Sequence, residues 1–86
     1  MEYKLNNKKL LSKILSNQKN VKFADFIKLI SCFGFKLDRV NGSHHIFIHK
    51  DISEIINIQN VKSEAKPYQI KQFLRIIEMY NLQFEE

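Results

Sequence analysis

Residues 34–59 read GFKLDRVNGSHHIFIHKDISEIINIQ, and this stretch decides the fold. Apolar and polar side chains alternate over 35–40, which is the period of a β-strand, and 44–49 and 54–59 have the composition of two more strands. Asn41-Gly42 joins the first two, and this is the strongest short signal for a hairpin because both residues accept a positive φ. Residues 50–53 form the next turn. The stretch therefore predicts a three-stranded antiparallel meander.

The segments on either side of these strands have the period of helices. Residues 4–16 repeat apolar side chains at helical spacing, 23–33 carry an apolar stripe that stops at Gly34, and Pro67 suits the first position of a helix that runs to about Tyr80. The order α-α-β-β-β-α predicts a small two-layer α+β domain, in which two helices cover one face of the sheet. The other face is free, and the helix over 4–16 packs on an edge or end of the sheet or serves a partner.

Length and composition restrict the class of protein. The chain has 86 residues, which is enough for one domain over 1–86, and 44% of them are hydrophobic. No apolar run approaches the length of a membrane span, and the N-terminus has no signal-like core. The single cysteine, Cys32, forms no internal disulfide and no multi-cysteine metal site. We therefore expect a cytoplasmic protein that does not enter a membrane.

The charge is concentrated in the first half of the chain. Residues 1–50 hold ten Lys or Arg and three Asp or Glu, whereas residues 51–86 hold four and six. A basic surface attracts phosphates or acidic partners, and nucleic acid is the commonest such partner of a small cytoplasmic domain. The charge taken alone is equally consistent with a chain that simply favours lysine on its surface.

All three histidines lie within six residues, at positions 44, 45 and 49. Histidine is the side chain best suited to move protons near pH 7. Neighbours on a strand point to opposite faces, so His44 shares a face with Ile46 and Ile48, while His45 shares the other with His49. His45 and His49 are about 13 Å apart along a strand, too far for one zinc ion. Spacing alone leaves both an active residue and an ordinary surface role open.

Other catalytic arrangements find little support in the sequence. Residues 1–50 hold only three acidic side chains, whereas a two-metal nuclease needs several converging carboxylates. Ser43 and His44 are adjacent on a strand and diverge, which argues against a nucleophilic pair. We expect Asn41 and Gly42, together with Ser43, to shape the hairpin so that His44 projects. No metal and no cofactor are expected.

The run from Gly34 to Phe47 resembles the HicA toxin family, also called the YcfA-like family. The shared pattern is a helix, Gly-Phe, an alternating strand with a basic residue, Gly-Ser-His and an aromatic residue three positions later, followed by a third strand and a closing helix. The resemblance covers roughly residues 22–82 and leaves the helix over 4–16 as an addition. It implies a double-stranded-RNA-binding-like fold and the toxin half of a type II toxin–antitoxin pair. It also implies a ribonuclease that cleaves mRNA and blocks translation.

The resemblance also implies functional residues and partners. The family's active histidine maps onto His44, with His45 as the second choice, and the implied partner is a HicB-like antitoxin. We expect a protein that is a monomer alone and a hetero-oligomer with antitoxin. His44 would act as general base or acid on RNA, and the residues expected to contact RNA are Lys36, Arg39, Ser43 and Lys50. The alternative is a non-catalytic RNA-binding or protein-interaction module on the same fold.

Overall fold

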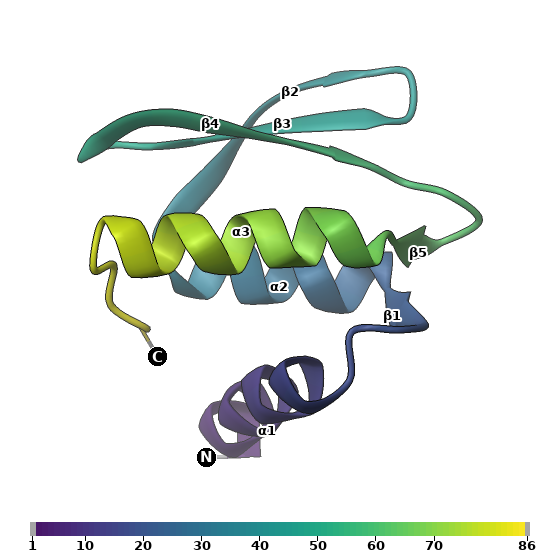
Figure 1. Cartoon of the computed structure of the whole chain (residues 1–86), viewed down its shortest axis with the longest axis vertical. Helices are drawn as coiled ribbons and strands as arrows, with labels where there is room; N and C mark the ends of the chain where they lie inside the picture. Colours follow the sequence, from purple (N-terminus) through teal and green to yellow (C-terminus); the bar gives the residue numbers. More distant parts are fainter. Residues whose placement is uncertain (1, 86) are drawn as a thin grey trace.

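A computed structural model describes residues 2–85, with side chains from residue 8 onward (Figure 1). Its helices are α1 (Glu2–Ser16), α2 (Phe23–Cys32) and α3 (Pro67–Met79). The main sheet contains β2 (Phe35–Asn41), β3 (His44–His49) and β4 (Ile52–Gln59), and two short strands, β1 (Val21–Lys22) and β5 (Glu64–Ala65), pair with each other.

The main sheet is the predicted antiparallel meander. Its order is β2-β3-β4, so β3 is hydrogen-bonded on both sides. Phe47 of β3 faces Leu37 of β2 on one side and Ile56 of β4 on the other. The register between β2 and β3 shifts between Leu37 and Arg39, which leaves Asp38 as an extra residue in the edge strand. The α+β class and the three-stranded sheet packed on helices are confirmed.

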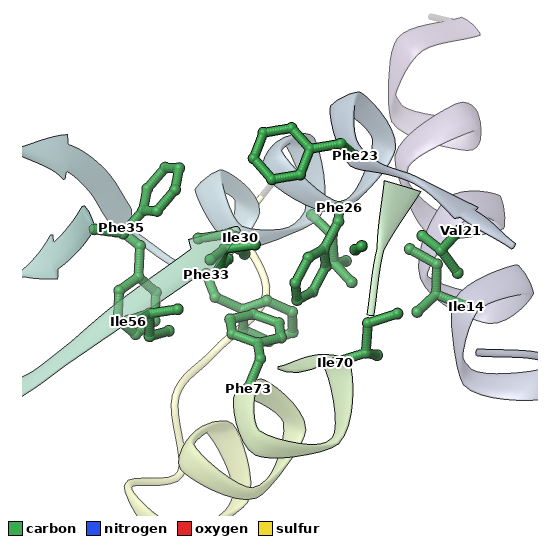
Figure 2. Packing of buried hydrophobic residues seen from close by; sticks show 14 of the residues in the cluster. Ile14, Val21, Phe23, Phe26, Ile30, Phe33, Phe35, Ile56, Ile70 and Phe73 are labelled. Atoms are coloured by element: carbon green, nitrogen blue, oxygen red, sulfur yellow. The ribbon is translucent and has the colours of Figure 1, made fainter. Parts of the chain in front are cut away.

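One face of the sheet packs against α2 and α3, and aromatic rings fill the space between them (Figures 1 and 2). Phe73 of α3 meets Phe26, Phe33 and Phe35 edge-on, with ring centroids 5.5, 5.7 and 5.9 Å away. Such edge-to-face pairs add about 0.5–1.5 kcal/mol each to what burial alone contributes. This cluster fixes the sheet on the helices and therefore fixes which face of β3 remains open.

The two-stranded sheet of β1 and β5 is absent from the sequence prediction, which assigned a strand to neither segment. Val21 pairs with Ala65 and Lys22 with Glu64, in antiparallel register. Val21 and Ala65 are buried, so the short pair closes the end of the helix layer rather than lying on the surface. Strands of two residues have no detectable period, and only the tertiary contact identifies them.

Helix α1 corrects a second expectation. It begins at Glu2, and it packs against α2 on the side of the helix layer away from the main sheet, not on an edge or end of the sheet (Figure 1). Ile14 is buried in the same cluster as Val21 and the aromatic rings (Figure 2). The apolar stripe of α1 therefore completes the core of this chain.

The hairpin between β2 and β3 differs by one residue from the expected turn. Asn41 belongs to β2 and pairs with His44, so the two loop residues are Gly42 and Ser43. Gly42 alone has a positive φ, of 64°, and it occupies the first central position, where type II′ turns favour glycine. The turn is therefore closed by Asn41 and His44, and it places His44 at the first position of β3.

Candidate active site

His44 stands on the open face of the main sheet, beside the hairpin turn. Its side chain is exposed, and its cross-strand neighbours are Asn41 on β2 and Gln59 on β4. The next residue on that face, Ile46, is 7% exposed yet lies outside the core cluster. Side chains of the open face therefore cover Ile46. Ile46 in turn gives the open face an apolar floor beside His44.

A hydrogen bond to the side-chain oxygen of Asn57 on β4 orients the His44 ring. The distance from His44 Nδ1 to Asn57 Oδ1 is 3.0 Å. An amide oxygen only accepts, so Nδ1 carries a proton in this arrangement, and the neutral ring keeps its lone pair on Nε2. The unbonded nitrogen is the one that a general base uses. With Asn57 Oδ1 as the acceptor, the bonded tautomer of His44 is the one in which Nε2 can take a proton.

His45 points to the opposite face and is half-buried. Its ring meets the ring of Phe23 at the start of α2, with centroids 4.8 Å apart and planes at 65°. Its Nδ1 lies 3.3 Å from the carbonyl oxygen of Ser43. His45 therefore attaches the hairpin to α2, and β3 separates it from the open face on which His44 stands.

His49 has both ring nitrogens engaged, at the far end of β3. Nε2 lies 3.1 Å from the carbonyl oxygen of Phe33, and Nδ1 accepts the backbone N–H of Asp51 at 3.0 Å. The two bonds together require the proton on Nε2. A Cβ at Gly34, whose φ is 92°, would lie only 2.9 Å from that nitrogen. His49 is thus a structural link between sheet and α2, with no nitrogen left for chemistry.

The four side chains expected to contact RNA divide into two groups. Arg39 shares the open face and lies diagonally across from His44. Residues in this diagonal relation have Cα atoms about 7–8 Å apart. The guanidinium of Arg39 pairs with Asp38. Ser43 lies in the turn next to His44. Lys36 pairs with Ile48 and Lys50 follows β3, so they lie roughly 13 and 20 Å from His44 along the strand. The structure does not bring these two lysines to His44.

Two residues at the end of β4, Gln59 and Asn60, hydrogen-bond to Ser43. Its carbonyl oxygen accepts the backbone N–H of Asn60 at 2.9 Å, and its hydroxyl lies 3.4 Å from Gln59 Nε2. The hairpin turn is therefore joined to the residues that follow β4. Neither Asn57 nor Gln59 was among the predicted site residues. Alternation over 54–59 places both on one face, but only the register between β3 and β4 places that face beside His44.

The single cysteine is not a reactive group. Cys32 is buried, and this burial raises the pKa of its thiol, while the positive charge of Lys28 lowers it by a smaller amount. A raised pKa leaves less thiolate, which is the nucleophilic form. Among the side chains of residues 8–85 the structure contains no group of three His, Cys, Asp or Glu able to hold a metal ion. Within residues 2–85, every helix is too short or too polar to cross a bilayer.

Comparison with known proteins identifies the family. Residues 23–79, which are 57 of the 86, match the family model of the HicA toxin of bacterial toxin–antitoxin systems. No curated protein and no solved structure gave a match. The matched segment starts at the first residue of α2 and ends at the last residue of α3, so it contains the hairpin, His44 and Asn57 and excludes α1 and β1. The chain belongs to the HicA family, the toxins of bacterial toxin–antitoxin systems.

Proposed function

We propose that this HicA-family toxin is a metal-independent endoribonuclease that cleaves mRNA, with His44 as its general base or acid. The observation that carries the proposal is the bond between His44 and Asn57, 3.0 Å long, on an open sheet face. It leaves Nε2 of an exposed histidine free and oriented, which is what proton transfer requires. The family match supports the toxin role, in which cutting mRNA blocks translation.

RNA carries its own nucleophile, so the protein has few tasks to perform. His44 Nε2 takes the proton of a 2′-hydroxyl, the 2′-oxygen attacks the adjacent phosphorus, and the bond from phosphorus to the 5′-oxygen breaks. The products are a 2′,3′-cyclic phosphate and a 5′-hydroxyl, whose oxygen takes its proton from water as it leaves, and His44 then returns its own proton to the solvent. Each proton has a donor and an acceptor, and a base of this kind contributes about 10²–10⁴-fold to the rate.

Positive charge on the open face supports the reacting phosphate. Among the four residues expected to contact RNA, Arg39 is the cation that shares both this face and this end of the sheet with His44. A guanidinium placed near the phosphorane oxygens stabilises the charge that develops there. Lys36 and Lys50 lie at the other end of the strand, where they would contact nucleotides farther along the RNA.

The proposed protein partner is a HicB-like antitoxin that covers the open face. The toxin would be a monomer alone and a hetero-oligomer with its antitoxin, in the cytoplasm. Ile48 and Ile55 are 41% and 53% exposed, and Ile48 shares a face with His44. Exposed isoleucines farther along the sheet from the active histidine suit a protein large enough to cover both and so block RNA from the site.

The same isoleucines favour a second candidate function. A domain that only binds a protein, or that binds RNA without cutting it, would also use an open face with an apolar floor. Under that reading, His44 contributes a hydrogen bond to the complex and no proton transfer. The two functions differ in a single measurable property, the appearance of cleaved RNA.

The test is RNA cleavage by purified protein in excess EDTA, with wild type beside His44→Ala. Cleavage by wild type alone supports a metal-independent ribonuclease that depends on His44. No cleavage by either folded protein would favour the binding module. End-group analysis adds a second criterion, because a cyclic phosphate on the product requires the 2′-hydroxyl to be the nucleophile.

A further inference from the structure

Four lysines gather around a pair of adjoining cavities beside the hairpin. One cavity, of about 450 Å³, is lined by residues that include Lys19, Lys62, Lys66 and Glu64, and the other, of about 410 Å³, by residues that include Lys22, Lys62 and Glu64. We call the two cavities, together with these four lysine side chains, the lysine cavity. Glu64 is the acidic side chain that lines both, and within the described residues it forms no ion pair with the four lysines. The cavity therefore carries an excess of positive charge.

The turn that carries Lys62 is tightly held in an unusual conformation. Val61 and Glu64 exchange two backbone hydrogen bonds of 3.2 and 3.0 Å, which leaves Lys62 and Ser63 as a two-residue loop. Both have a positive φ, of 52° and 66°, a conformation for which Asn and Gly are the usual residues. A lysine at such a position costs stability, so its presence is better explained by what its side chain does.

One hydrogen bond joins the segment that lines the lysine cavity to the turn beside His44. Asn60, which lines the second cavity, donates its backbone N–H to the carbonyl oxygen of Ser43 in the turn next to His44. Phe23, which lines the same cavity, meets the ring of His45 on the covered face of β3, so the cavity begins at the end of the sheet rather than on the open face. Asn60 also accepts the backbone N–H of Ser63 on its side-chain oxygen at 2.9 Å. One rigid segment therefore connects the loop of Lys62 to the hairpin.

We propose that the lysine cavity binds the phosphates of the RNA strand that flanks the cleaved bond. The proposal rests on the proposed function, because it assigns the path of that same substrate. An RNA strand with one phosphate at His44 continues past Asn60 toward the cavity. The lysines there provide mobile point charges that suit a backbone of regularly spaced phosphates. Lys19 and Lys22 precede residue 23, so this part of the path lies outside the segment that matches the family.

The test compares two double variants that remove the same charge. Lys22→Gln with Lys62→Asn empties the cavity of two cations, and asparagine tolerates the positive φ at position 62. Lys28→Gln with Lys71→Gln removes two exposed lysines that line neither cavity. Both are made in a His44→Ala background, so that RNA stays intact. Binding of a fluorescent single-stranded RNA is measured by anisotropy over roughly 50–200 mM salt.

The cavity variant should bind RNA at least about tenfold more weakly, and the slope of log K against log salt should become shallower by about 1.4, for two lost contacts. The control variant should retain the wild-type slope. The double variant Lys22→Arg with Lys62→Arg keeps both positive charges and should bind RNA as tightly as the protein that retains the two lysines. If the cavity variant failed to fold, Lys22→Gln alone would carry the test, with half the change in slope.

Three results would overturn the inference. Equal weakening in both double variants would show a general effect of charge. Unchanged RNA binding by the cavity variant, from a protein whose wild type cleaves RNA, would remove the cavity from the path and leave the ribonuclease intact. Loss of antitoxin binding without loss of RNA binding would assign the cavity to a protein partner. A wild type that neither binds nor cleaves RNA would refute the proposed function itself.

Discussion

His44 and His45 are adjacent in the chain, yet the two faces of β3 give them different surroundings. His44 is exposed and held by one amide oxygen, whereas His45 is half-buried against Phe23. His44 presents its Nε2 on an exposed ring, whereas the half-buried ring of His45 packs on Phe23 and attaches the hairpin to α2. The comparison teaches that the face of the sheet, more than the residue type, separates a candidate catalyst from a structural residue.

The largest expected effect separates the two histidines directly. His44→Ala should lower the cleavage rate by about 10²–10⁴-fold, because it removes the group that transfers the proton. His45→Phe should stay within a few-fold of wild type, since a phenyl ring can keep the edge contact with Phe23. Single-turnover cleavage of one RNA by both variants checks this. An equal loss in the two would end the distinction between the faces.

The next prediction tests the open face alone. Asn57→Ala removes the hydrogen bond that orients His44, and a lost bond of this kind corresponds to roughly a tenfold loss in kcat. KM and the midpoint of thermal unfolding should change little, because Asn57 is exposed. Gln59→Ala is the matched control on the same strand, since Gln59 makes no bond to the His44 ring.

The tautomer of the His44 ring is a second readout, and it would not change if Asn57 had only a structural role. The nitrogen chemical shifts of His44 should report a proton on Nδ1 in wild type and a mixture of tautomers in Asn57→Ala. A single Nδ1-protonated form in both proteins would show that Asn57 does not select the tautomer.

A substitution on the covered face should affect stability rather than cleavage. Phe23→Leu removes the edge contact with His45 and should lower the free energy of unfolding by about 1 kcal/mol. The rate of cleavage by the folded protein should stay near wild type, which is the reverse of the pattern for Asn57→Ala. Urea denaturation and single-turnover cleavage on the same preparation check both halves, and a large loss of rate in the folded variant would couple the two faces.

The smallest effect comes from the turn that both faces share. Asparagine at position 42 accepts the positive φ of Gly42, and a Cβ there meets nothing within 4 Å. Gly42→Asn should therefore change stability by less than about 0.5 kcal/mol and leave cleavage intact. Gly42→Val is the contrasting variant, because a β-branched residue cannot take this φ without strain. If both substitutions had the same effect, the conformation of the turn would be unimportant to the position of His44.

Much of the fold follows from local pattern, and the site follows only in part. The alternation over 35–40, the apolar stripe of α2 and Pro67 at the start of α3 are local signals, and each element is present. His44 was selected by a motif. Its partner Asn57 is 13 residues away, and the bond between them depends on which residues of β3 and β4 pair. Strand register is set by packing across the whole sheet, so no local pattern contains it.

The errors have the same physical origin. Residues 21–22 and 64–65 are too short to show a period, and their pairing is a contact between distant segments. The place of α1 depended on which apolar surface remained uncovered once α2 and α3 had packed on the sheet. The turn shifted by one residue because Asn41 pairs with His44, which leaves Gly42 and Ser43 as the loop. In each case the missing information is tertiary.

The close packing of Gly34 against His49 has a consequence for how this chain can vary. A side chain at position 34 would collide with the ring nitrogen that contacts Phe33, so it requires a smaller residue at position 49. A smaller residue at 49 alone leaves the carbonyl oxygen of Phe33 and the N–H of Asp51 without partners. Relieving that collision would still not free position 34, because its φ of 92° strains any side chain whatever residue stands at 49: glycine is therefore required there both by the backbone and by the space.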